Sequence, residues 1–262
     1  MNTELQPVAP LSDDPKSAGQ PVVVIVAHHD DIEFGVAASV ARWRAEGAVV
    51  TYVIVTDGGA GSNDPDVTRA ELVERRKQEQ LAAAQVVGVD DVRFLGYPDG
   101  ELQPTLALRR DLTRILRQVR PYRVVLQDPT SVLLGSEYIN HPDHRAAGEA
   151  ALYAVFPSSE TRPIFPELLA EGLEPHKVSE VFLTLSTQPT HYVDTSAYLD
   201  AKLKALACHV SQIGAGEDAV NGALKWTRDW DSETGRKVGV AYAETFRVMK
   251  FDQSRPQSEA SA

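Results

Sequence analysis

Runs of apolar residues alternate along the chain with stretches whose apolar positions recur at helical spacing. Residues 21–27 form a continuous run rich in valine, which indicates a strand buried on both faces of a sheet. Residues 33–46 follow with apolar side chains on one helical face, and the pattern stops at Gly47. The alternation predicts further strands over 49–56, 92–95, 123–127 and 181–185, and further helices over 68–87, 106–119, 142–154 and 198–209. Strand and helix therefore alternate through most of the chain.

This alternation predicts an α/β fold in which helices flank a mostly parallel sheet. Neither an internal repeat nor a linker divides the pattern, so we expect a single domain over residues 21–251. The segments 1–20 and 252–262 are rich in Pro, Ser, Asp, Gln and Ala without periodicity, and we expect both to be flexible tails. A chain of 262 residues is long enough to bury one large core.

The amino-acid composition of the chain limits the classes of partner that it can bind. The formal net charge of −11 argues against a nucleic-acid or anionic-membrane partner, because both need clustered Lys and Arg. Cys208 is the single cysteine, so the chain can form neither an internal disulfide nor a thiolate metal cluster. No apolar run approaches the roughly 20 residues of a membrane span, and residues 1–20 lack a secretory signal. We expect a soluble cytoplasmic protein whose partner is a small molecule.

The first predicted strand ends in a cluster of polar side chains. His28, His29, Asp30 and Asp31 follow it directly, and Glu33 opens the next helix. In parallel sheets, ligands bind beyond the carboxyl ends of the strands. An ordinary polar loop with an Asp as helix N-cap is the alternative. Two His and two Asp after a wholly apolar strand favour metal binding or proton transfer over that alternative.

A second cluster, Asn-His-Pro-Asp-His over residues 140–144, opens a later helix. His141 and His144 are three residues apart and so share a helix face, although a solvated helix start would look the same. Two imidazoles and one carboxylate suit zinc or ferrous iron, whereas magnesium and calcium prefer oxygen ligands. Three protein ligands leave a position for water, as in catalytic sites. The two clusters together predict a catalytic metal centre.

The paired motifs AHHDD (27–31) and HPDH (141–144) resemble those of the PIG-L/LmbE-like family of zinc-dependent de-N-acetylases, which act on N-acetylglucosaminyl compounds. The similarity extends over most of residues 21–250 and includes Thr56-Asp57-Gly58-Gly59, Arg76-Lys77-Gln78-Glu79, Leu95-Gly96-Tyr97-Pro98-Asp99-Gly100 and parts of 193–212. The resemblance implies a Rossmann-like α/β fold, which agrees with the alternation of elements.

The resemblance also implies roles for individual residues. His28, Asp31 and His144 would hold Zn²⁺, with Fe²⁺ as the alternative metal. Asp30 would be the general base, and its position next to Asp31 suits proton transfer from a bound water. His141 and Asp143 would form an oxyanion-stabilising pair, and we expect the Asp143 carboxylate to raise the pKa of His141 and keep it protonated.

Three further positions stay open. Arg76 would contact substrate by the resemblance, but an ion pair with Glu79 on the helix surface explains it equally well. His29 stands where the family usually has Pro, and we favour a solvated loop residue over a proton carrier. Some family members place a Tyr two residues before HPDH; here that residue is Ile139, and Tyr138 is one position away.

The resulting prediction is hydrolysis of the acetyl or another acyl amide of an N-acetylglucosamine-type amino sugar or its conjugate, by attack of a metal-activated water. An amidase for a larger thiol- or sugar-conjugate amide is the alternative among enzymes. Phosphoester hydrolysis would need a second metal ion. A non-catalytic Rossmann-like module that binds a sugar or nucleotide would not need Asp30. A homo-oligomer is compatible with the sequence.

Overall fold

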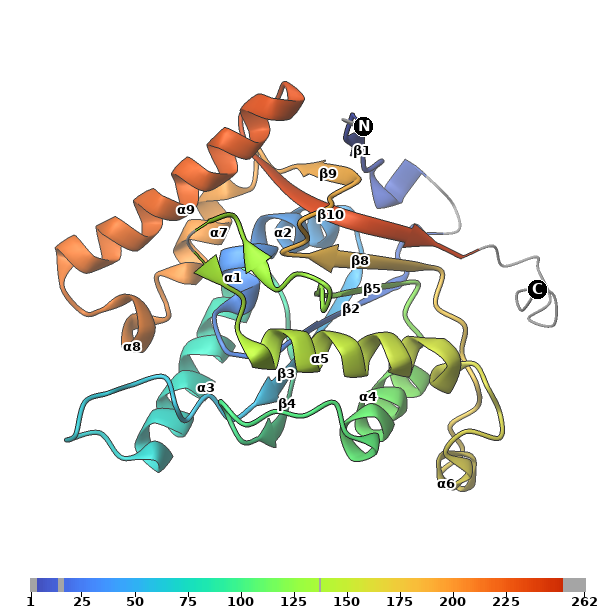
Figure 1. The fold of residues 1–262 in the computed structure, drawn as a ribbon. Helices are drawn as coiled ribbons and strands as arrows, with labels where there is room; N and C mark the ends of the chain where they lie inside the picture. The colour runs from blue at the N-terminus through green and yellow to red at the C-terminus, as the bar shows by residue number, and fades with distance from the viewer. Residues whose placement is uncertain (1–3, 14–16, 137, 252–262) are drawn as a thin grey trace.

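An eight-stranded sheet lies at the centre of the protein (Figure 1). The computed structural model describes residues 4–13, 17–136 and 138–251. The strand order is β1-β9-β10-β8-β5-β2-β3-β4. The strands are β1 (Gln6–Pro7), β2 (Pro21–Val26), β3 (Val49–Thr56), β4 (Asp91–Tyr97), β5 (Arg123–Gln127), β8 (Glu180–Thr184), β9 (His191–Asp194) and β10 (Ala243–Lys250). Strands β4, β3, β2, β5 and β8 are parallel, and β10 runs antiparallel between β8 and β9, which confirms the predicted α/β class.

Helices cover both faces of the sheet. Val22, Val24 and Val26 of β2 point into one layer, and Val23 and Ile25 point into the other, because successive strand residues face opposite ways. The first layer holds α1 (Asp31–Gly35), α2 (Ala37–Ala45), α3 (Arg69–Val86) and α7 (Leu199–Leu206). The second holds α4 (Leu106–Val119), α5 (Pro142–Tyr153) and the following turn η2 (Ala154–Ser159). The two cores explain why β2 is apolar throughout.

Strand β2 occupies the middle of the parallel part of the sheet. It pairs with β3 on one side and β5 on the other, and its residues from Val22 to Val26 are buried. The chain leaves its carboxyl end at Ala27 and enters α1 at Asp31. In Figure 1, α5 begins beside the loop that joins β2 to α1. The two polar motifs of the sequence therefore meet at the carboxyl edge of the sheet.

Several elements differ from the sequence prediction. The predicted helix over 33–46 is two helices, α1 and α2, because Val36 leaves helical geometry at φ −143°. The long α9 (Glu217–Val238) and strand β10 were not predicted, and α9 packs along β10, α7 and the short α8 (Val210–Ile213) in Figure 1. The remaining elements are the 3₁₀ turn η1 (Leu11–Asp13), the hairpin β6 (Leu133–Leu134) and β7 (Tyr138–Ile139), and α6 (Pro166–Ala170).

Part of residues 1–20, for which we expect a flexible tail, lies against the domain. Strand β1 pairs with β9, and Leu11 is 1% exposed within the first core. Leu11 is the apolar residue that anchors this segment, which composition alone did not reveal. The expected tail over 252–262 lies outside the described residues. None of the helices in the described ranges is long and apolar enough to cross a membrane.

Candidate metal centre

Two helix N-termini bring the predicted ligands together. His28 lies in the loop after β2, and Asp31 is the first residue of α1. His141 is the N-cap of α5, so His144 lies in the first turn of that helix, with Pro142 at a position where a missing N–H costs nothing. His28, Asp31 and His144 offer ligand atoms that all lie within 4.8 Å of one another.

The spacing of these three donors suits a tetrahedral metal. His144 Nε2 lies 3.2 Å from His28 Nδ1 and 3.1 Å from one Asp31 oxygen, and His28 Nδ1 lies 3.5 Å from the other oxygen. Ligands bound tetrahedrally to zinc at about 2.1 Å are roughly 3.4 Å apart. The donor set and its spacing therefore fit a zinc ion with one open position.

Partners outside the trio orient both imidazoles. His144 Nδ1 donates to Asn140 Oδ1 at 2.9 Å, since the Asn140 amide nitrogen donates to the Ser131 carbonyl at 2.8 Å. His144 Nε2 then presents a lone pair to the centre. His28 Nε2 lies 3.0 Å from Asp99 and 3.3 Å from Asp143, so its Nδ1 faces the centre in the same way. Hydrogen bonds of this kind fix the tautomer of metal-binding histidines.

Asp99 is a site residue that the sequence analysis did not assign. It follows β4 at the same edge of the sheet and is 6% exposed. Burial would raise the pKa of its carboxyl, but the hydrogen bond and charge of His28 lower it to about 2. The motif that contains Asp99 was noted in the sequence, and its place after a parallel strand was the available signal.

The electrostatics of the cluster favour a cation. Burial opposes the charged form of His28, yet hydrogen bonds to three surrounding aspartates raise the pKa of this imidazole to about 12. Burial would likewise raise the pKa of Asp31, but the His144 and His28 imidazoles hold it well below its ordinary value. Buried carboxylates that stabilise the positive charge of a protonated imidazole would also stabilise the charge of a divalent ion bound by the neutral imidazole.

The expected pairing of Asp143 with His141 stays a prediction, since a ligand atom of each lies within 4.8 Å of the other but the carboxylate bonds elsewhere. The Asp143 carboxylate accepts from the backbone N–H groups of Gly100 (2.7 Å) and Leu102 (3.2 Å) and contacts His28. The backbone N–H of Asp143, not its carboxylate, bonds to His141 Nδ1 at 3.2 Å. Burial and the charge of His28 lower the pKa of His141 despite the opposing charge of Asp143. Because His141 Nδ1 accepts the Asp143 N–H, the neutral form of this imidazole carries its hydrogen on Nε2.

Asp30 lies beside the trio in a strained backbone conformation. Its φ of 88° and ψ of −24° are rare for a non-glycine residue, at a cost on the order of 1–3 kcal/mol. Burial raises the pKa of its carboxyl above the ordinary value, and Arg76 opposes that shift. Such strain persists only where surrounding contacts impose it, and it is common at functional sites.

Arg76 and His29 are both buried, which changes their interpretation. Arg76 is 3% exposed and donates to the carbonyls of Gly58 (3.0 Å) and His29 (2.7 Å), which does not agree with the alternative of a surface ion pair with Glu79. His29 is 1% exposed and stacks on Phe94, so it is not a solvated loop residue. Gly58 has to be glycine here, since a Cβ would lie 2.7 Å from the His29 ring.

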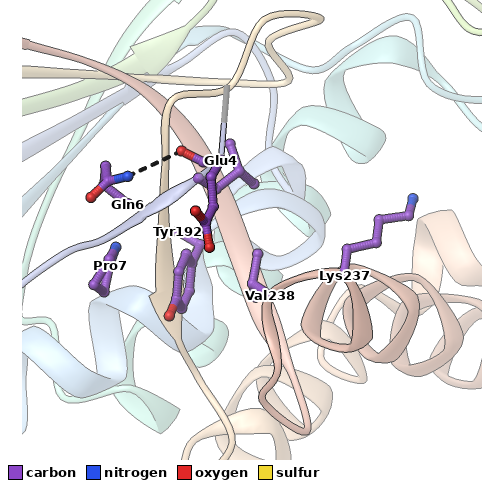
Figure 2. A pocket seen from close by; sticks show the side chains of 7 residues that line it. Glu4, Gln6, Pro7, Tyr192, Lys237 and Val238 are labelled. Carbon is purple, nitrogen blue, oxygen red and sulfur yellow. Dashed lines mark hydrogen bonds between the residues drawn. The ribbon is translucent and has the colours of Figure 1, made fainter. Parts of the chain in front are cut away.

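Tyr138 lies in β7 and is 52% exposed. Partial burial and the charge of Asp31 raise the pKa of its phenol, which places it within electrostatic reach of the centre. A cavity of about 790 Å³ lies elsewhere, between β1, β9 and the end of α9. Figure 2 shows Glu4, Tyr192 and Lys237 around it, and none of the predicted site residues lines it.

A group of two histidines and one aspartate at the carboxyl edge of an α/β sheet is a candidate metal site of the kind that metal-dependent hydrolases use. The sequence profile of the PIG-L family, GlcNAc-PI de-N-acetylase, matches residues 23–155, about half of the chain. The protein therefore belongs to the PIG-L family, as its motifs predicted.

Relatives and solved structures agree with this assignment. The chain is 32% identical over 232 residues to diacetylchitobiose deacetylase of Thermococcus kodakarensis, covering 87% of this chain and 82% of the relative. It is 29% identical over 225 residues to a probable N-acetyl-alpha-D-glucosaminyl L-malate deacetylase 2 of Bacillus anthracis, covering 78% and 90%. The structure of N,N'-diacetylchitobiose deacetylase from Pyrococcus horikoshii with its inhibitor MPG superposes with a TM-score of 0.81 and 32% identity, covering 92% and 88%.

Proposed function

We propose that this protein is a zinc-dependent de-N-acetylase that releases acetate from an N-acetylglucosamine-type amino sugar or its conjugate. The observation that carries the proposal is the convergence of His28, Asp31 and His144, with Asp30 beside them, in a chain of this family. Ferrous iron suits the same donors and is the alternative metal.

The residues around the centre would divide the reaction between them. When bound, a zinc ion would act as a Lewis acid and lower the pKa of water. Asp30, whose pKa burial raises toward neutrality, would accept a proton from the attacking water and return it to the leaving amine. His141 would donate its Nε2–H to the oxyanion that develops on the amide carbonyl.

Asp143 and Asp99 would act through His28. Asp143 fixes His28 Nε2 and also binds the loop at Gly100 and Leu102, while Asp99 accepts from the same imidazole nitrogen. The support of His141 by the Asp143 charge stays a prediction beside this role. Substrate contact by Arg76 stays a prediction, and its buried bonds favour a role in holding the loops.

The relatives narrow the substrate class. Those named above are deacetylases of diacetylchitobiose and of a GlcNAc malate conjugate. The common element of these compounds is the N-acetyl group on a glucosamine ring. We propose that this chain recognises the same element, and the group attached at the sugar's anomeric carbon stays to be found.

The test is acetate release by the zinc-loaded protein from N-acetylglucosamine, N,N'-diacetylchitobiose and GlcNAc linked to malate or inositol. We expect acetate and free amine in equal amounts from at least one of them, and none with His144→Ala. Cleavage of only larger acyl or thiol-conjugate amides would favour the amidase alternative. Binding of these sugars without any hydrolysis would contradict the proposal.

A further inference from the structure

One peptide group beside the centre is held at both ends by the same helix. This peptide joins His29 to Asp30. Its carbonyl oxygen accepts from Arg76 Nη2 at 2.7 Å, and its N–H donates to Gln80 Oε1 at 3.3 Å. Arg76 and Gln80 are four residues apart, so they lie one turn apart on the same face of α3. Both side chains are almost completely buried.

The orientation of this peptide decides where Asp30 points. Rotation of the peptide plane changes ψ of His29 and φ of Asp30 together, and φ of Asp30 is 88°. An unrestrained aspartate would favour a negative φ, which would turn its carboxylate away from its present direction. The two bonds from α3 therefore oppose the relaxation that the backbone would otherwise undergo.

A buried chain of polar contacts fixes the Gln80 amide. Gln80 Nε2 donates to Glu33 Oε1 at 3.1 Å, and Glu33 Oε2 accepts from His209 Nε2 at 3.1 Å. Gln80, Glu33 and His209 are all 0% exposed. Because the amide nitrogen has to face the Glu33 carboxylate, the amide oxygen is left facing the Asp30 N–H.

We infer that Arg76 and Gln80 clamp the His29–Asp30 peptide, and that Gln80, oriented by Glu33 and His209, is a positioning residue for Asp30. The inference rests on the proposed function in so far as Asp30 is the base. The clamp also explains why Arg76 is buried between two loops, since it bonds Gly58 as well.

Gln80→Met removes the amide and keeps the length of the side chain. With zinc at wild-type occupancy, we expect kcat to fall roughly tenfold to a hundredfold with KM little changed, as for a misplaced catalytic group. Gln78→Met is the matched control, because Gln78 lies on the exposed face of α3 and its amide donates to Glu74 on the same helix. The control should keep wild-type kcat. Equal kcat in Gln80→Met and Gln78→Met would overturn the inference.

A double variant separates positioning from general loss of stability. In an Asp30→Asn background the base is already absent, so adding Gln80→Met should lower kcat little further. A double variant slowed by the full factor seen in Gln80→Met alone would show that Gln80 does not act through Asp30, and would contradict the inference.

A crystal structure of zinc-bound Gln80→Met tests the clamp without any activity. We expect φ of Asp30 to leave the positive region; retention of the wild-type value would contradict the clamp. If Gln80→Met does not fold, Glu33→Leu and Glu33→Gln replace it. In Glu33→Leu φ of Asp30 should leave the positive region, and in Glu33→Gln it should stay there. Identical Asp30 geometry in the two variants would overturn the inference. A wild-type protein that binds zinc but releases no acetate would instead contradict the proposed function, while these structures would still decide the clamp.

Discussion

Gly148 lets helix α5, which carries His144 of the metal centre, pack closely against the backbone of Gln127. It lies four residues after His144 on the same helix. A Cβ at this position would lie 2.2 Å from the Gln127 carbonyl oxygen, where ordinary contact begins at 3.4 Å. Gln127 ends β5, which is paired with strands on both sides, so its backbone cannot easily yield. Gly148→Ala should therefore push α5 outward.

The size of the effect follows from this shortfall of about 1.2 Å between 2.2 and 3.4 Å. Overpacking of a buried contact costs about 1–3 kcal/mol of unfolding free energy. Metal sites tolerate deviations of only about 0.2 Å in ligand distance. A shift of α5 moves His144 away from His28 and Asp31, and we expect zinc affinity to fall roughly tenfold to a hundredfold, the range seen when support of a ligand is lost.

Urea unfolding of the zinc-free protein and zinc competition against a chelator measure the two effects separately. Gly222→Ala in α9 is the matched control, since nothing lies within 4 Å of a Cβ there. The control should gain about 0.5–1 kcal/mol from helix propensity and keep its zinc affinity. If Gly148→Ala is as stable as the Gly222→Ala variant and binds zinc equally well, the packing of α5 does not set the position of His144.

Four further predictions concern single side chains. His28→Ala and His144→Ala should each lose the bound divalent ion, because two ligands do not hold a catalytic site; full metal content by elemental analysis would refute the ligand assignment. Asp30→Asn should keep the metal and the backbone, since Asn also tolerates positive φ, and lower kcat by roughly 10²–10⁴; parallel loss of metal would make Asp30 a ligand instead. Asp143→Asn puts an amide N–H against one of two backbone N–H donors, and should cost about 1–3 kcal/mol of stability by urea unfolding; wild-type stability would refute those bonds. Burial lowers the pKa of His176 below its ordinary 6.5, and this effect exceeds the opposite effect of its hydrogen bond to a backbone carbonyl. The stability that neutral His176 contributes is therefore present above pH 6.5 and lost as the pH falls below it. His176→Asn should lose less stability than wild type between pH 7.5 and 5.5, and equal losses would contradict this.

The sequence predicted the parallel core and the ligand edge because both depend on local patterns. The wholly apolar β2 indicated burial on two faces, and the polar residues that follow it lie at the carboxyl edge, as parallel topology requires. The HPDH motif predicted the start of α5 and the shared face of His141 and His144. These features need only the period of a strand or helix and the direction of a parallel crossover.

Other features depend on contacts that no local pattern encodes. Asp99 reaches His28 only because β4 pairs with β3 in a particular register. Helix spacing placed Asp143 near His141, but it did not reveal that the loop at Gly100 and Leu102 would bind the carboxylate. His29 was misjudged because the Phe94 ring that covers it comes from a different strand.

Helix α9 and strand β10, near the C-terminal end of the chain, were not predicted from the sequence for a related reason. The buried residues of α9 are Thr227, Asp231 and Gly235, so no large apolar side chain marks its buried face. The buried Lys202 explains its attachment, since the ammonium bonds Asp231 of α9 at 2.8 Å and Glu244 of β10 at 2.8 Å. Such a buried ionic cluster appears in the sequence only as ordinary charged residues.

The most direct test of the central claim is a zinc titration of the metal-free protein, with acetate release from N,N'-diacetylchitobiose measured at each step. We expect no release without metal and a linear rise that ends at one zinc per chain, with Asp30→Asn binding the same single zinc but remaining nearly inactive. Acetate release that persists in excess chelator, or that needs a second ion per chain, would contradict a single centre built from His28, Asp31 and His144.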